Sequence, residues 1–318
     1  MIFEMIKLRD SLLMAILVAG FLASSSRAQP PIYPDVDHLI DTHIHLYDTT
    51  REGGVPWPPP SDKVLYKPHL PAEFHQVSKS AGVTGVVIVE ASDRLVDNSW
   101  VLNLVSDDDY FVALVGNIDP YREDFTQQLS KLTEDKRFVG VRARNAKPID
   151  YADAKVLENF RALAAHNKSL DFLCNGQGIK GVQDVDALAR AVPELTIVVD
   201  HVLGYDVDGK LPGKEWLAAV HRLAENKNVY CKVSGLYQRC TIQPAPQEIS
   251  HYKTLLDVLW KEFGSERLIY GSNWPCTKKS GDYASFVRLV NSYFQSKGQA
   301  AVDGYFWKNA AKAYRLDL

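Results

Sequence analysis

The stretch HLIDTHIHL (residues 38–46) is the first of eight apolar runs that we interpret as β-strands. The other runs are VTGVVIVEA (83–91), YFVALVGNID (110–119), RFVGVRAR (137–144), SLDFLCN (169–175), LTIVVDH (195–201), VYCKVSG (229–235) and RLIYGSN (267–273). They are nearly continuous in apolar residues, which is typical of strands covered on both faces. The sequence therefore predicts a parallel sheet.

Helical patterns lie between these runs. Residues 153–167, 213–228 and 282–298 repeat apolar side chains with the period of an amphipathic helix, and Asp282 is placed to cap the last one. Eight strands alternating with helices over about 280 residues match a (β/α)8 TIM barrel. The alternative, a doubly wound open sheet, usually carries a glycine-rich phosphate loop after its first strand, and DTHIHLYD (41–48) has none. We expect a single-domain α/β barrel with its site at the carboxyl ends of the strands.

The N-terminus has the features of a cleavable signal peptide over residues 1–28. Lys7 and Arg9 precede an apolar run (11–23), and small residues stand at Ser26 and Ala28, after which we place the cleavage. The run is shorter than the roughly 20 residues that cross a bilayer; a buried N-terminal helix is the alternative. A Pro-rich lead-in covers 29–37 and the barrel 38–318. We expect a secreted or periplasmic protein.

The charge and the apolar segments of the chain argue against two classes of partner, nucleic acids and membranes. A net charge of −3 and a pI near 6.3 argue against nucleic acid, which usually requires a basic face. No second apolar segment approaches membrane length, so we expect a small-molecule substrate and no membrane contact after signal removal; the oligomeric state is unknown from sequence. Cys174 and Cys231 lie in strand-like runs, where we expect buried free thiols. The sequence does not decide whether Cys240 and Cys276 form a disulfide.

Two histidines close the first strand. Asp41, His43 and His45 alternate along it, and alternate residues of a strand point to one side. His43 and His45 could therefore meet at one metal ion or one substrate, or form a hydrogen-bonded surface pair. Glu90 ends the second strand as a buried carboxylate that needs a partner, either in catalysis or in a salt bridge. Asp119 ends the third strand as a substrate contact or a helix cap.

The later strands also deliver polar side chains. Arg142 could clamp a carboxylate or lactone oxygen with its planar fork, or form an ion pair with Glu90 or Asp119. His201 ends the sixth strand as a third imidazole or as a structural histidine. Lys232 lies inside an apolar run, so we expect its side chain to point into the barrel mouth.

The eighth strand ends in Asn273, an amide that cannot act as a base. Trp274 follows it, and Trp57 lies in a Pro-rich loop. Either ring could stack on a sugar or serve plain packing.

These motifs together resemble one family. The amidohydrolase-related (amidohydrolase 2) group, in particular its branch with fuconolactonase-like and 2-pyrone-4,6-dicarboxylate lactonases, resembles this chain over residues 38–316 in IDTHIH, GVTGVVIVEAS, FVGVR, DHVLG, KVSGL, YGSNWP and NAAKAY. The resemblance implies a barrel hydrolase that opens a sugar-derived or carboxylated lactone with activated water.

The resemblance also implies site residues. His43 and His45 would face the substrate and His201 would join them, with or without one divalent metal ion, zinc or manganese; a mononuclear and a metal-free site are equally compatible. Arg142 would bind the substrate. A binuclear centre is not expected, because the fourth strand offers arginines instead of the bridging lysine of the wider superfamily.

The chain departs from the family at Asn273, where GSDWP is usual and the aspartate activates water. The basicity must then come from a metal-bound water, from Glu90 or from a histidine. Two alternative functions follow, namely a sugar- or lactone-binding barrel without hydrolysis, and a related metal-dependent decarboxylase.

Overall fold

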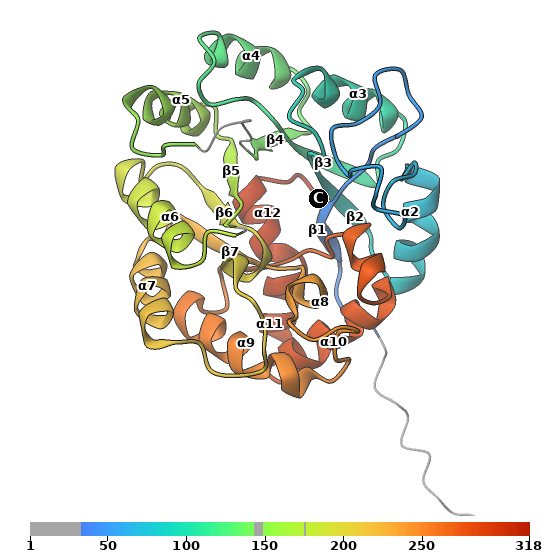
Figure 1. Cartoon of the computed structure of the whole chain (residues 1–318), viewed down its shortest axis with the longest axis vertical. Coiled ribbons are helices and arrows are strands. Elements are labelled where there is room, and N and C mark those ends of the chain that lie inside the picture. Colours follow the sequence, from blue (N-terminus) through green and yellow to red (C-terminus); the bar gives the residue numbers. More distant parts are fainter. Residues whose placement is uncertain (1–32, 143–148, 175) are drawn as a thin grey trace, which may run out of the picture. The chain divides into compact units, whose positions relative to one another are not determined.

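The computed structural model describes residues 33–142, 149–174 and 176–318, and the part from Tyr33 to Leu318 is one compact unit. The predicted signal peptide (1–28) and Arg144 lie outside the described residues. Eight parallel strands follow one another around the sheet in chain order (Figure 1). They are β1 (Ile40–Ile44), β2 (Gly85–Val89), β3 (Phe111–Gly116), β4 (Phe138–Val141), β5 (Ser169–Phe172), β6 (Ile197–Val199), β7 (Val229–Val233) and β8 (Leu268–Tyr270). The predicted (β/α)8 barrel is confirmed.

Most helices surround the strands in Figure 1, whereas α12 lies in the centre of the ring of strands. The helices are α2 (Pro71–Ser78), α3 (Val96–Leu104), α4 (Phe125–Leu132), α5 (Ala154–Ala165), α6 (Ile179–Ala191), α7 (Lys214–Glu225), α8 (Leu236–Arg239), α9 (Ile249–Phe263), α10 (Tyr283–Gln295), α11 (Gln299–Asp303) and α12 (Asn309–Tyr314), with shorter turns η1 (Lys79–Ala81), η2 (His201–Gly204), η3 (Cys276–Lys279) and η4 (Gly304–Lys308). The predicted cap of α10 is confirmed, because the Asp282 side chain accepts from the backbone N–H of Ser285. Among the described residues, none of the helices has the length and apolarity to cross a membrane.

The barrel interior is apolar at the amino ends of the strands. Inward side chains there form one cluster, which is joined by residues of the C-terminal helix α12: Ile40, Val87, Val115, Val198, Ile269, Ala310, Ala313 and Tyr314. A larger cluster fills the space between strands and outer helices. Helix α12 therefore packs into the barrel beneath the polar residues at the carboxyl ends.

The sheet closes between β8 and β1 at their carboxyl ends. The backbone N–H of His45 donates to the carbonyl of Trp274, and that of Asn273 donates to the carbonyl of His43, both at 2.8 Å. The first strand and the residues after the last strand are thereby held side by side, which brings Asn273 next to the histidine pair.

Asp41 stabilises the β1–β8 seam, where the sheet closes, and its side chain does not point to the site. Its Oδ1 accepts from the backbone N–H of Ser272 (2.8 Å) and of His43 (3.1 Å), and its Oδ2 accepts from the hydroxyl of Tyr283 (2.7 Å). The prediction that Asp41 shares a face with His43 and His45 is wrong. The physical reason is a β-bulge between Asp41 and Ile44, which breaks the alternation of side chains.

The four cysteines are free thiols. The Sγ atom of Cys240 lies 3.3 Å from Nε2 of His251, and Cys276 lines a different part of the molecule, at the barrel mouth. The disulfide that the sequence left open between Cys240 and Cys276 is therefore not formed.

Replacing Asp41 should weaken the seam. Asp41→Leu removes a buried acceptor and leaves two backbone N–H groups and one hydroxyl without it, so we expect the free energy of unfolding to fall by about 3 kcal/mol or more. Urea denaturation followed by circular dichroism measures this. Asp107→Leu, at an exposed position, is the control; equal midpoints for the two variants would contradict the role of Asp41.

Candidate active site

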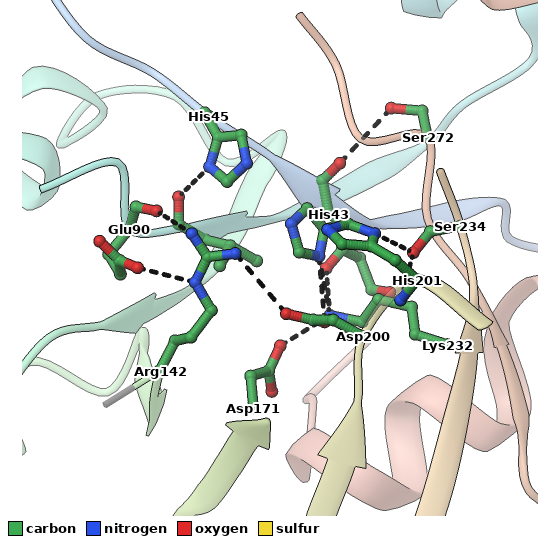
Figure 2. A network of polar contacts seen from close by, with 12 residues as sticks. His43, His45, Glu90, Arg142, Asp171, Asp200, His201, Lys232, Ser234 and Ser272 are labelled. Carbon is green, nitrogen blue, oxygen red and sulfur yellow. Dashed lines mark hydrogen bonds and ion pairs between the residues drawn. The ribbon is translucent and has the colours of Figure 1, made fainter. Parts of the chain in front are cut away.

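A cavity of about 260 Å³ opens at the carboxyl ends of the strands, where a barrel normally carries its site. Its wall includes five of the residues singled out in the sequence and several others: His45, Trp57, Arg142, Leu173, His201, Gly235, Gln238, Arg239, Asn273 and Cys276. The predicted imidazoles are close together, because the ring of His43 lies 4.4 Å from that of His201 and 5.0 Å from that of His45, between centroids. Figure 2 shows this group and its polar contacts.

His43, His45 and His201 form a trio of imidazoles, and His43 is its fully buried member. Its Nδ1 lies 3.2 Å from Oδ1 of Asp200, and its buried Nε2 has no hydrogen-bond partner among the described residues. Burial lowers the pKa of His43 well below its usual value; Asp200 opposes this, while Lys232 and His201 add to it. The ring is therefore neutral. Its Nδ1 faces Asp200 and also lies 3.3 Å from Nζ of Lys232. The tautomer with its proton on Nδ1, the side of the carboxylate, leaves the Nε2 lone pair for a metal ion or a substrate.

His201 follows β6 on the short helix η2. Its Nδ1 lies 2.9 Å from the hydroxyl of Ser234, and burial lowers its pKa to about 4. Three successive non-glycine residues here, His201, Val202 and Leu203, have positive φ angles of 52°, 49° and 61°. Such strained backbone is found mainly at functional sites, and here it holds the imidazole at the cavity wall.

His45 completes the trio from the loop after β1. Its Nδ1 lies 2.9 Å from the carbonyl oxygen of Val89, which favours the tautomer with a proton on Nδ1. The ring packs edge-on against Trp57 at 5.4 Å between centroids. The Pro-rich loop therefore supplies an aromatic wall to the cavity, as the sequence left open for Trp57.

Arg142 points inward, as expected, but its guanidinium already holds protein groups. Its Nε donates to Oε1 of Glu90 at 2.7 Å, its Nη2 donates to the Glu90 carbonyl at 3.0 Å, and its Nη1 lies 3.6 Å from Asp200. Burial alone would lower the pKa of Arg142, but Glu90 and Asp200 raise it. The ion pair with Glu90 that the sequence left open is present, so this carboxylate is stabilised in its charged form.

Lys232 is fully buried and is not part of the cavity wall. Its ammonium donates to Oδ2 of Asp171 at 2.7 Å and to the carbonyl of Thr42 at 3.1 Å, and it lies 3.2 Å from Asp200. Burial raises the pKa of Asp171 to about 6 despite the ammonium. Burial would also raise the pKa of Asp200, but Lys232 and His43 hold it well below its usual value. Lys232 points into the barrel interior, but the expectation that it reaches the barrel mouth is wrong, because its contacts are buried carboxylates and a carbonyl below the cavity.

Asn273 adopts a left-handed backbone with φ of 60°. Asparagine is one of the few residues that tolerate this region, because its short side chain bonds locally. A Cβ at Gly235 would lie 3.1 Å from Nδ1 of His201 and 3.5 Å from Nδ2 of Asn273, so the two side chains border the same glycine. Asn273 is therefore placed to act on the same bound molecule as His201.

Two other predicted residues lie away from the cavity wall. Trp274 is buried and packs against His69 and Phe74, with ring centroids 5.2 and 5.0 Å apart. Asp119 accepts from the backbone N–H of Tyr121, two residues later, as expected for a turn or helix cap.

The sequence interpretation missed five residues of the site: Asp171, Asp200, Gln238, Arg239 and Cys276. Asp171 was detectable, since it is a lone charge inside an apolar strand, which is the signal that identified Lys232. Gln238 and Arg239 belong to a short helix after β7, and nothing in their local sequence marks them.

The residues fit a metal ion. His43, Asp200 and His201 offer ligand atoms that lie within 4.8 Å of one another, and the partnerless Nε2 of His43 is a suitable donor. Imidazole and carboxylate suit zinc and manganese. Because Asp200 already pairs with Lys232 and Arg142, the imidazoles are the more available ligands.

A single methyl group should test the packing of the site. A Cβ at Gly271 would lie 2.8 Å from Cβ of His43 and 3.3 Å from Cδ of Lys232. Gly271→Ala should therefore displace His43 and lower kcat/KM by roughly tenfold or more without changing any charge. The control is Gly213→Ala, where a Cβ meets nothing within 4 Å. Unchanged kcat/KM in a folded Gly271→Ala protein would contradict the tight packing.

Comparisons with known proteins agree with this geometry. The chain is 28% identical over 290 residues to an L-fucono-1,5-lactonase of Burkholderia ambifaria, covering 87% of this chain and 96% of that protein. It is 25% identical over 289 residues to an L-fucono-1,5-lactonase of Burkholderia multivorans, covering 87% and 96%. A zinc-bound amidohydrolase structure from Burkholderia multivorans superposes with a TM-score of 0.77 at 23% identity, covering 88% of this chain and all of that one. The sequence pattern of the Amidohydrolase family matches residues 40–316, and the chain belongs to that family.

Proposed function

We propose that this protein hydrolyses a lactone, either sugar-derived or carboxylated, to the corresponding hydroxy acid. The observation that carries the proposal is the group of three close imidazoles, His43, His45 and His201, beside Asn273 at a cavity of about 260 Å³. The likeness to L-fucono-1,5-lactonases over nearly the whole barrel supports it. A cavity of this size is at the lower end for small-molecule sites, which suits a single ring.

His201 is the best placed group to activate water. It lines the cavity, and its pKa of about 4 keeps the ring neutral and able to accept a proton at neutral pH. Glu90 is less suitable, because its Oε1 holds Arg142 at 2.7 Å. Water attacks the lactone carbonyl while its proton passes to the imidazole. The ring C–O bond then breaks, and the departing alkoxide takes that proton, which gives the hydroxy acid.

Asn273 takes the role of a hydrogen-bond donor in this reaction. Its amide cannot accept the proton of water, but it can donate to the oxygen that becomes negative in the tetrahedral intermediate. Arg239 lines the same wall, and its guanidinium is held by the carbonyl of Tyr205 at 3.2 Å and by an ion pair with Asp206. Asn273 would therefore stabilise charge where the related enzymes place an acid.

A single divalent ion, zinc or manganese, is part of the proposal. His43 and His201, with His45 or Asp200, would hold it. With the ion bound, a metal-bound water of lowered pKa would take the place of His201 as the source of basicity; His201 would act as the base in the metal-free site. The proposed location of the protein is the periplasm or the outside of the cell, because residues 1–28 have the features of a signal peptide.

Hydrolysis should be measured on a panel of aldonolactones with a pH indicator. We expect turnover by the wild type and a loss of roughly 10²–10⁴-fold in kcat/KM for His201→Asn, the range typical of a general base. Because the base acts when neutral, activity should persist as pH falls and decline only near pH 4, where His201 is protonated. His221→Asn, on the exposed face of α7, is the matched control.

Two outcomes would count against parts of this proposal. An acid limb near the ordinary histidine pKa of about 6.5 would contradict the assignment of His201. A lactone that raises the melting temperature without turnover would favour a binding protein, in which case Asn273→Asp should gain activity.

Metal content tests the second part of the proposal. Protein purified without chelators should contain close to one equivalent of a divalent metal by elemental analysis, and His43→Ala should lose it because Nε2 of His43 is the buried donor. His221→Asn should keep the metal. A metal-free and active wild type would leave the imidazoles to act alone.

A further inference from the structure

The site is connected to the last helix of the chain by buried polar contacts. Tyr314, near the end of α12, is buried, and its hydroxyl lies 2.9 Å from Oδ1 and 3.0 Å from Oδ2 of Asp171. Asp171 belongs to β5 and is far from Tyr314 in the sequence, but the two side chains meet inside the barrel. The hydroxyl is thus a donor to a carboxylate inside the barrel.

Lys232 extends this network of polar contacts from Asp171 toward the cavity. Its ammonium donates to Oδ2 of Asp171 at 2.7 Å and to the carbonyl of Thr42 at 3.1 Å. It also forms an ion pair with Oδ1 of Asp200 at 3.2 Å and lies 3.3 Å from Nδ1 of His43. These contacts on several sides fix where the nitrogen can lie. The same oxygen of Asp200 is the one 3.2 Å from Nδ1 of His43.

We propose that Tyr314 is a positioning residue for the pair His43–Asp200, and that it acts through Asp171 and Lys232. Without the hydroxyl, the Asp171 carboxylate loses the one uncharged side-chain donor that it has among the described residues and can rotate. Lys232 then shifts with it, and two groups in contact with its ammonium, Oδ1 of Asp200 and Nδ1 of His43, are no longer held. These side chains are all buried, so water does not readily replace the missing contact.

The proposal goes beyond the proposed hydrolysis, on which only its kinetic readout rests. The variant is Tyr314→Phe, which removes one oxygen and keeps the ring. Its matched control is Tyr305→Phe, because Tyr305 is also buried in the C-terminal segment, but its hydroxyl donates to the backbone carbonyl of Val233 at 2.9 Å instead of to the charged network.

Two measurements separate positioning from mere stability. Imidazole ¹⁵N NMR, with the His43 signals assigned by their loss in His43→Ala, should show the Nδ1–H tautomer in wild type and Tyr305→Phe and a mixture in Tyr314→Phe. On a lactone substrate, Tyr314→Phe should lower kcat by roughly tenfold with KM within about twofold, whereas Tyr305→Phe should leave both near wild type.

A double-mutant cycle shows whether Asp171 transmits the effect. Asp171→Asn should lower kcat on its own, and adding Tyr314→Phe should change it by no more than about twofold, because the tyrosine acts on a carboxylate that is already gone. Additive losses would overturn the proposed route. If Tyr314→Phe does not fold, Asp171→Asn is measured by NMR instead.

The outcomes are distinct. Unchanged His43 ¹⁵N shifts in Tyr314→Phe, or in Asp171→Asn, would overturn the proposal. Equal kcat values for the two tyrosine variants would do the same. If the wild type opens no lactone, the proposed function fails while the NMR measurement still decides the role of Tyr314.

Discussion

The carboxylate of Asp200 lies between three side chains from three other strands, and the arrangement of the site depends on it. Oδ1 is 3.2 Å from both His43 and Lys232, and Oδ2 is 3.6 Å from Arg142. A buried carboxylate is tolerated only with such partners, because burial of an unpaired charge is strongly unfavourable. The strands that carry these groups are therefore held at the positions where their charges balance, and the imidazoles follow.

Burial is the main reason why His43 and His201 stay neutral. Lys232 and Arg142 supply two positive charges below the cavity, and three carboxyl groups face them, those of Glu90, Asp171 and Asp200. Burial lowers the pKa of His43 well below its usual value and that of His201 to about 4; Asp200 opposes this, and the nearby cations add to it. Neutral imidazoles are what proton acceptance and metal binding both require. Asn273 suits such a site, since a further carboxylate would have raised the pKa of its neighbours.

Much of the fold and part of the site could be predicted from the sequence. Near-continuous apolar runs identify strands covered on both sides, and strand-end polar residues such as His43, His45 and His201 must gather where parallel strands end. The side of β1 to which Asp41 points could not be predicted, because a bulge in this strand reverses the direction of the side chain and no local sequence signal marks the bulge. Trp57 and Arg239 come from a loop and a short helix whose paths are set by tertiary packing. Lys232 shows a different limit: its inward direction was predictable, but its partners depend on which strands stand opposite.

Helix α12 occupies the barrel interior beneath this network, and its residues are synthesised after every residue of the cavity wall. Until α12 has been made, the amino end of the barrel interior is unfilled, and Asp171 lacks the hydroxyl of Tyr314. The site can therefore be assembled only after α12 has been synthesised. Chains that end early, through a nonsense codon or proteolysis, would keep every residue of the cavity wall and still lack the support that orders it.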